Sequence, residues 1–167
     1  MISSKVDIIG KCGQHDPDGT QNPKAEKRFE ENYKFYISFE NSLCNQYVTE
    51  KVFLRLKHNI VPIVYGQANY SQILPPHSYI NIQDFPSAKA LAKFLVELGN
   101  NPEEYLSYFW WKDHFSVRRD DTDIMEAMFC KLCKKLHDNT LPDKNYGDLG
   151  HWWRKGACHK NGYNYNL

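Results

Sequence analysis

Several features common in other protein classes are missing from this sequence. It lacks the run of about 18 apolar residues that a membrane-spanning helix requires. Its 21 basic and 20 acidic residues leave a formal net charge of only +1, which argues against bulk binding to nucleic acid or to an anionic membrane surface. Internal repeats and low-complexity blocks are also missing, which excludes a repeat architecture.

The amino-terminal residues lack the apolar core of a signal peptide, because Lys5 and Asp7 interrupt the apolar positions. An apolar run at residues 6–9 follows almost at once and predicts a short buried strand. A complete protein usually carries a leader or cap before its first strand. We therefore expect a truncated chain or a partial gene product.

The residues that are present indicate a folded domain of ordinary size. At 167 residues, with 41% hydrophobic residues, the chain is long enough to bury a core. Aromatic residues make up 14% of the chain, and its 11 Tyr and 4 Trp suit stacking on sugars and bases as well as packing in a core. We divide the chain into a domain at residues 1–138 and a C-terminal tail at residues 139–167.

Apolar periodicity predicts an α/β fold, with a Rossmann-like parallel sheet and flanking helices. Strands are expected at residues 6–9, 35–39, 60–65 and 79–82, a loop at 11–32, and helices at 50–58, 87–98, 101–111 and 122–137. Thr49 and Ser87 are expected N-caps, and Asn101-Pro102 is expected to open a helix. The strand–helix–strand order over residues 35–65 favours parallel pairing through a right-handed crossover. Pro62 is unfavourable there in a central strand, because it lacks an N–H.

The segment KFYISFENSLCNQYVTEK, residues 34–51, is the most informative part of the chain. An alternating apolar strand ends in a polar turn, and a helix then begins with Glu50 and Lys51. Polar residues that follow a parallel strand, here Glu40 and Asn41, point into the crevice where α/β sheets bind ligands. Because the first turn of a helix favours anions, a diphosphate could bind there beside Lys51. Glu50 could accept hydrogen bonds from a ribose diol, and Tyr47 could stack on a base or a ribose.

Each of these residues also has a structural explanation that requires no ligand. Lys51 is then a solvated surface residue, and Glu50 stabilises the start of its own helix. Glu40 and Asn41 are then part of an ordinary turn, and Tyr47 anchors the loop. The residue types alone leave both explanations open.

Residues 39–42 (FENS), followed by YVTEK at residues 47–51, closely resemble the signature of the α1,3-fucosyltransferases of glycosyltransferase family 10. The similarity continues through residues 61–66, 70–75, 84–85 and 105–109, and it reaches a helix with the spacing Cys130-x-x-Cys133. The resemblance implies one half of a GT-B architecture. It also implies a donor site for GDP-fucose, with Lys51 on the diphosphate and Glu50 on the ribose. The full expected set of donor-binding residues is Glu40, Asn41, Tyr47, Glu50 and Lys51.

By the same resemblance, the reaction is an inverting transfer of L-fucose from GDP-fucose to a GlcNAc hydroxyl of a glycoprotein glycan, in α1,3 linkage. No metal or other cofactor is expected. The acceptor site and the general base, a carboxylate, are expected in an N-terminal domain outside this chain. No catalytic residue is therefore assigned here, and the isolated chain is expected to transfer little or no fucose.

The resemblance also implies a location on the lumenal side of the Golgi membrane, with the membrane anchor outside this chain. The alternative function is a non-catalytic, truncated protein that binds a GDP-sugar or a partner. Another alternative is an interaction module stabilised by zinc through C-terminal Cys and His residues.

Five cysteines are present, and because the number is odd, at least one thiol is free or paired outside the chain. The zinc alternative rests on the C-terminal Cys/His cluster, whose spacing matches no known zinc pattern: Cys130, Cys133, His137, Cys158 and His159. The family resemblance suggests structural disulfides instead. Cys130 and Cys133 are the candidates, and the remaining cysteines stay unassigned.

Two further motifs are weak. Asp121-Thr122-Asp123 has the form of a manganese–nucleotide motif, but the N-cap of the helix that follows explains it. Asn69-Tyr70-Ser71 is a glycosylation sequon, of which chance produces about one in a chain of this size.

Overall fold

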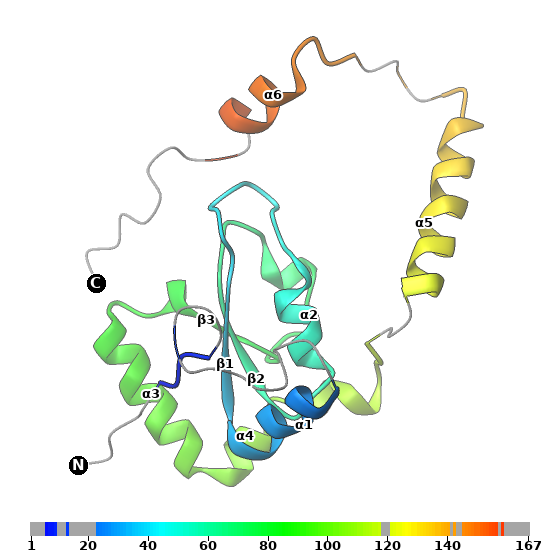
Figure 1. The fold of residues 1–167 in the computed structure, drawn as a ribbon. Helices are drawn as coiled ribbons and strands as arrows, with labels where there is room; N and C mark the ends of the chain where they lie inside the picture. The colour runs from blue at the N-terminus through cyan, green and yellow to red at the C-terminus, as the bar shows by residue number, and fades with distance from the viewer. Residues whose placement is uncertain are drawn as a thin grey trace.

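The computed structural model describes residues 6–9, 13, 23–117, 121–140, 142, 145–156 and 158. Its centre is a parallel three-stranded sheet in the order β1-β2-β3 (Figure 1). The strands are β1 (Phe35–Phe39), β2 (Val61–Tyr65) and β3 (Ile80–Asn81). All five residues of β2 are buried, as expected for the middle strand of a sheet covered on both faces. The sequence therefore predicted the α/β class and the parallel pairing correctly.

Pro62 lies in the central strand, where the sequence argued against it. In a parallel ladder, successive N–H groups point alternately to the two neighbouring strands. The N–H of Val61 donates to Lys34 O on the β1 side, at 2.9 Å. The position of the missing N–H of Pro62 therefore faces β3, where the ladder begins only at Ile63, opposite Ile80. Pro62 removes no hydrogen bond of the sheet, and this explains why it is tolerated.

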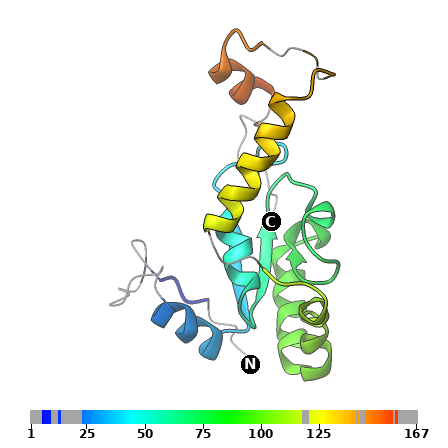
Figure 2. The same cartoon turned by 90° about the vertical axis from the view of Figure 1, so that its right-hand side faces the viewer.

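Helices cover the two faces of the sheet (Figures 1 and 2). Helix α2 (Glu50–Leu56) connects β1 to β2, and its Val52 and Leu56 pack with Val64 in one core cluster. Helix α3 (Ala88–Asn100) covers the other face, where Leu91 and Leu98 join a second cluster. That second cluster contains Val61, Ile63 and Tyr65 of β2. The two clusters follow from the alternation of side chains along β2.

The expected starts of two helices are confirmed. The Ser87 hydroxyl accepts a hydrogen bond from the N–H of Ala90 at 3.2 Å and caps α3. Asn101 caps the next helix, α4 (Pro102–Ser107), by accepting from the N–H of Glu104 at 3.2 Å. Three 3-10 helices complete this part of the chain, at Tyr70–Gln72, Ile82–Asp84 and Trp110–Asp113.

Two predictions for the amino-terminal part were wrong. Residues 6–9 form no strand beyond an isolated bridge at Ile9, and Val6 and Ile8 are 65% and 59% exposed. No described strand pairs with this run, and strands are stabilised by pairing rather than by composition. Residues 23–32, expected in a loop, form helix α1 (Pro23–Asn32). A proline at the first helical position is favourable, and the buried Phe29 packs against Ile60 at the start of β2.

Helices α5 (Asp121–Leu136) and α6 (Leu149–Gly156) extend away from the sheet (Figures 1 and 2). The sequence predicted α5 but no helix in the tail. Large apolar side chains of α5 are exposed, and Met128 and Phe129 are both 60% exposed. Within the described residues, no helix combines the length and the apolar character needed to cross a membrane. The proposed domain boundary at residue 138 remains a prediction.

Candidate functional site

The predicted donor residues gather around the β1–α2 loop, residues 40–49, and the first turn of α2. The loop leaves the sheet at the carboxyl end of β1, where the N–H of Glu40 still donates to Tyr65 O at 3.0 Å. The carboxyl edge of a parallel sheet is where α/β folds bind their ligands. The fold therefore places the predicted residues at the expected edge.

Lys51 is held across the mouth of this loop. Its ammonium group donates to the carbonyl oxygen of Phe39, the last residue of β1, at 2.9 Å. It also donates to the side-chain oxygen of Asn41. The helix and the strand end thus place one cation and one amide together, although ten residues separate them in sequence. Asn41 and Lys51 are therefore in direct contact, and their role in donor binding stays a prediction.

Glu40 is in the predicted place, but its carboxylate already has partners. Its side chain is buried, with 2% of the residue exposed. One carboxylate oxygen accepts from the Thr49 N–H at 2.9 Å, and the other accepts from the Thr49 hydroxyl at 2.7 Å. Thr49 occupies the N-cap position of α2, as predicted, but its side chain makes no cap hydrogen bond. Glu40 therefore fixes the start of α2, and the sequence offered no sign of this bond.

Tyr47 and Glu50 complete the predicted set. Tyr47 is partly buried, and its N–H donates to Cys44 O at 3.1 Å in a turn that contains Gln46 at φ 59°. The Tyr47 ring meets the Trp153 ring edge-on, with centroids 6.4 Å apart. Glu50 is the first residue of α2 and is exposed. An exposed carboxylate at this position is accessible to a diol, whereas that of Glu40 is not.

Gly66 and Tyr70 belong to this edge of the sheet and were missed as site residues. A Cβ atom on Gly66 would lie 2.5 Å from the Tyr70 hydroxyl and 3.3 Å from Cγ of Glu40. The Tyr70 hydroxyl is buried and has no hydrogen-bond partner among the described residues. Burial, followed by the nearby charge of Glu40, raises the pKa of Tyr70 to about 12, so the phenol stays protonated at neutral pH. The signal in the sequence that could have pointed to these residues was Gly66, the glycine directly after β2.

The disulfide lies in the loop rather than on α5. Cys44, inside the β1–α2 loop, is bonded to Cys158, 114 residues away. Cys130 and Cys133 are exposed free thiols on α5. The structure therefore pairs two cysteines that the sequence left unassigned. A bond from Cys130 or Cys133 to a cysteine outside the described residues stays a prediction.

The described residues contain no group of three or more His, Cys, Asp or Glu side chains that could hold a metal ion. His137 contacts Cys133 on α5, with 3.9 Å between the Cys133 sulfur and Nδ1 of His137. His159, the remaining member of the C-terminal Cys/His cluster, lies outside the described residues. The loop instead presents one cation, one amide and one exposed carboxylate, which are groups that bind phosphate and hydroxyl oxygens.

The family model for the C-terminal part of glycosyltransferase family 10 (fucosyltransferase) matches residues 2–152. This chain belongs to that family. It is 40% identical over 151 residues to alpha-(1,3)-fucosyltransferase C of Drosophila melanogaster, covering 89% of this chain and 34% of that protein. It is 38% identical over 139 residues to the human 4-galactosyl-N-acetylglucosaminide 3-alpha-L-fucosyltransferase FUT6, covering 81% of this chain and 36% of that protein.

A solved structure of an alpha1,3-fucosyltransferase shares the fold of this family 10 chain, with a TM-score of 0.50 and 22% sequence identity. The match covers 75% of this chain and 37% of the solved chain. The Rossmann-like character of the sheet is therefore confirmed. The chain spans about a third of the length of the curated relatives it matches.

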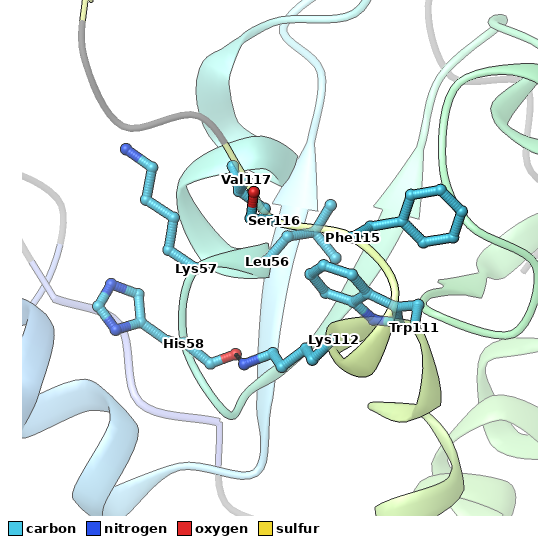
Figure 3. Close-up of a pocket in the computed structure, with 8 residues that line it drawn as sticks. All are labelled: Leu56, Lys57, His58, Trp111, Lys112, Phe115, Ser116 and Val117. Carbon is cyan, nitrogen blue, oxygen red and sulfur yellow. Dashed lines mark hydrogen bonds between the residues drawn. The ribbon is translucent and has the colours of Figure 1, made fainter.

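A pocket in this family 10 chain lies at the far end of α2, away from the β1–α2 loop. This pocket, of about 370 Å³, contains none of the predicted donor residues (Figure 3). Its lining includes Leu56 and Lys57 at the end of α2 and Trp111 and Lys112 of the 3-10 helix. Helix α2 therefore connects two different regions, with the predicted donor residues only at its start.

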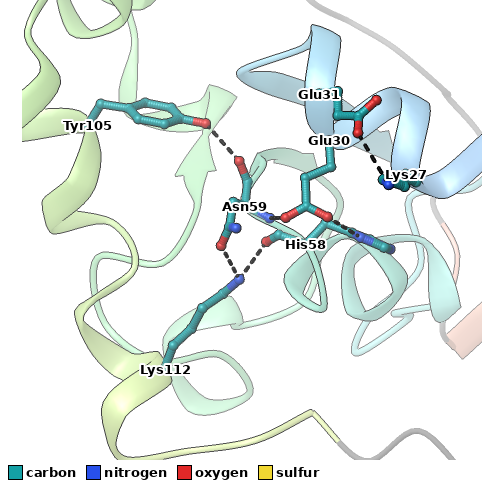
Figure 4. Close-up of polar contacts among 7 residues, drawn as sticks. All are labelled: Lys27, Glu30, Glu31, His58, Asn59, Tyr105 and Lys112. Atoms are coloured by element: carbon teal, nitrogen blue, oxygen red, sulfur yellow. Dashed lines mark hydrogen bonds and ion pairs between the residues drawn. The ribbon is translucent and has the colours of Figure 1, made fainter.

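Polar contacts beside this pocket, which include its lining residues His58 and Lys112, hold the elements together at the amino end of the sheet (Figure 4). Glu30 of α1 accepts from the N–H of Asn59 at 3.1 Å and contacts Nδ1 of His58 at 3.1 Å. Lys112 donates to His58 O and to the Asn59 side chain, both at 2.8 Å. The Tyr105 hydroxyl donates to Asn59 O at 3.1 Å. These contacts join α1 and α4 to the turn that follows α2, and this structural role explains them without a ligand.

Proposed function

We propose that this chain binds GDP-fucose at its β1–α2 loop and supplies the donor half of an inverting α1,3-fucosyltransferase of the GT-B type. The observation that carries the proposal is the position of Lys51. Its ammonium group lies at the carboxyl edge of the sheet, where Phe39 O and the Asn41 side chain hold it. The family to which the chain belongs, a family of fucosyltransferases, supports the choice of donor.

The proposed chemistry assigns a separate task to each donor residue. As fucose leaves, negative charge builds on the diphosphate of GDP, and a preorganised cation lowers the barrier. Lys51 provides this cation, and Asn41 orients it. The exposed carboxylate of Glu50 accepts hydrogen bonds from the ribose diol, and Tyr47 packs against the nucleoside.

The attack on the anomeric carbon requires a general base that deprotonates the GlcNAc hydroxyl of the acceptor glycan. None of the donor residues is assigned this role, because Glu40 is buried on Thr49 and Glu50 is directed to the ribose. We assign the base and the acceptor site to the part of the relatives' length that this chain does not span. The chain alone then binds the donor and transfers little or no fucose.

We further propose that the protein works on the lumenal side of the Golgi membrane, anchored by a segment outside this chain. The disulfide between Cys44 and Cys158 supports an oxidising compartment, because disulfides are rare in the cytosol. Immunolocalisation of the full-length protein, with antibody access before and after permeabilisation of the Golgi, tests this location.

Calorimetric titration of the purified chain with GDP and with GDP-fucose tests donor binding. We expect saturable binding that Lys51→Ala weakens about 10- to 100-fold, the range for losing a charge-assisted hydrogen bond to phosphate. Lys57→Ala is the matched control, because Lys57 lies at the other end of α2 and lines the distant pocket. Equal binding by both variants, or no binding by the folded wild-type chain, would reject the proposal.

A further inference from the structure

The C-terminal part of the chain contacts the β1–α2 loop at two separate points. We call residues 149–156 and Cys158 the C-terminal strap. Cys158 is bonded to Cys44, and the backbones of the two residues form an antiparallel bridge. Trp153 of α6 meets the ring of Tyr47 edge-on, with an interplanar angle of 83°. Figure 1 shows α6 beyond the tip of this loop, well away from the sheet.

The loop has few internal contacts of its own at this point. Asn41, Ser42, Asn45 and Gln46 are exposed, whereas Cys44 is buried with 2% exposed. The Glu40–Thr49 and Asn41–Lys51 bonds hold the two ends of the loop, whereas the turn bond from Tyr47 to Cys44 and a parallel bridge between Asn45 and Gln67 are the local restraints at its tip. Gln46 has a positive φ of 59°, which is unfavourable for a residue with a side chain. The tip of the loop therefore has few bonds of its own, and contacts from the C-terminal strap add to them.

We propose that the C-terminal strap is a component of the donor site and that Trp153 and Cys158 are positioning residues for Tyr47. They act through Tyr47 and Cys44. The disulfide fixes the backbone three residues before Tyr47, and the Trp153 indole fixes the ring of Tyr47. A preorganised loop loses less conformational freedom when the nucleotide binds, so donor affinity depends on the strap. This inference rests on the proposed donor function.

The residues of the proposed site are far apart in the sequence, which explains why local sequence patterns do not reveal it. The donor residues lie within residues 40–51, whereas Trp153 and Cys158 come about 100 residues later. The disulfide joins two residues that are 114 positions apart. The family model stops at residue 152, just before both of them.

The test compares the double variant Cys44→Ser/Cys158→Ser with Cys130→Ser, in which a free exposed thiol is removed and the disulfide remains. Calorimetry with GDP gives the affinity, and hydrogen exchange at the Tyr47 amide reports the turn. We expect the double variant to bind GDP about tenfold more weakly, with faster exchange at Tyr47, as loss of preorganisation predicts. Cys130→Ser should match the wild type in both measurements.

A second pair of variants leaves the disulfide in place, so the test does not depend on folding of the cysteine variant. Trp153→Ala should weaken GDP binding several-fold through loss of the ring contact, and Trp153→Phe should restore most of it, because an aromatic edge remains. Restoration by Phe would not be expected if Trp153 merely added bulk to the tail.

The outcomes separate this inference from the donor function. If the wild type binds GDP, and the double variant and Trp153→Ala bind it with the same affinity, the role of the strap is overturned. The donor function then still stands. Unchanged exchange at Tyr47 in both variants would also overturn it. If the wild type binds no GDP, the donor function fails and the strap fails with it as a part of that site.

Discussion

At the scale of single residues, Glu40 and Glu50 are two carboxylates with different tasks. Glu40 is buried and bonded to the backbone and hydroxyl of Thr49, whereas Glu50 is exposed at the start of α2. Removing Glu40 leaves the partly buried N–H and hydroxyl of Thr49 without their acceptor, whereas the exposed Glu50 side chain has no hydrogen bond among the described residues. The first change should therefore act on the fold of the site, and the second on the ligand alone.

We expect Glu40→Ala to lower the free energy of unfolding by about 1–3 kcal/mol, the usual penalty for an unsatisfied buried group, and to weaken GDP binding as well. Glu50→Ala should weaken GDP binding with unfolding unchanged. Glu40→Gln should fall between wild type and Glu40→Ala, because its amide oxygen still accepts from Thr49. Urea unfolding and calorimetry measure both effects. A fully stable Glu40→Ala variant with no GDP binding would instead place Glu40 on the ligand.

Gly66 lies where the structure leaves no room for a side chain. An added Cβ would lie 2.5 Å from the hydroxyl of the buried Tyr70. We expect Gly66→Ala to destabilise the chain by about 1–3 kcal/mol, as for overpacking of a core. Tyr70→Phe should be nearly neutral, because the hydroxyl has no partner among the described residues. In Gly66→Ala/Tyr70→Phe the clash is gone, so stability should largely return.

A double-mutant cycle from urea unfolding measures this coupling between Gly66 and Tyr70. Additive effects of the two substitutions would contradict the proposed clash and would point to a backbone requirement at Gly66 instead.

At the scale of elements, Glu30 joins α1 to the turn that follows α2. Burial acts to raise its pKa, but the hydrogen bonds from His58 and from the Asn59 N–H outweigh burial and hold the pKa below its ordinary value of 4.5. Burial lowers the pKa of the neighbouring Lys112, and the charge of Glu30 opposes this effect. An acid with a lowered pKa adds stability above its unfolded pKa and loses that stability as the pH falls through the folded value.

We therefore expect Glu30→Gln to reduce the free energy of unfolding near neutral pH, by about 1 kcal/mol for loss of a charged hydrogen-bond acceptor. The difference from wild type should vanish as the pH falls through the lowered pKa of Glu30, because the carboxylate then becomes protonated. Urea unfolding at several pH values measures this. Glu31→Gln is the matched control, because Glu31 pairs with Lys27 at 3.7 Å on the exposed surface. The same pH dependence in both variants would contradict the assignment.

Elements whose causes are local could be predicted from the sequence. The cap of α3 by Ser87 is one example, and β1, with its alternating apolar residues, is another. Helix α1 could not be predicted in this way, because its buried Phe29 packs against Ile60, about thirty residues away in the sequence. Pro62 looked unfavourable because the sequence does not tell where the ladder with β3 begins. Similarly, the motif assigned Asn41 and Lys51 to one site but predicted neither the contact between them nor the bond from Glu40 to Thr49.

At the scale of the whole molecule, the sequence had no means to pair Cys44 with Cys158. The parity of five cysteines limits the pairings, but only the fold brings a residue of the β1–α2 loop beside one in the tail. The strap, which lies in the predicted C-terminal tail, contacts the β1–α2 loop through Cys158 and Trp153. Long-range contacts of this kind are set by the chain path, which local patterns do not encode.

Helix α5 has few contacts with the rest of the described chain. None of its described residues belongs to the three core clusters, and Met125, Met128, Phe129, Leu132 and Leu136 are each at least 50% exposed. A helix of this length is only marginally stable in water without tertiary packing. Helix α5 therefore has little tertiary packing to protect it against opening.

We expect native-state hydrogen exchange to show little protection in α5 and strong protection in β2, where all five residues are buried. Helix α3 is the matched control, because it is also a long amphipathic helix but has its inner face in a core cluster. If α5 were protected as well as α3 in dilute solution, its apolar face would have to be covered by another surface. Low protection that rises with protein concentration would identify that surface as a second copy of the chain, whereas low protection at every concentration would establish α5 as an isolated helix.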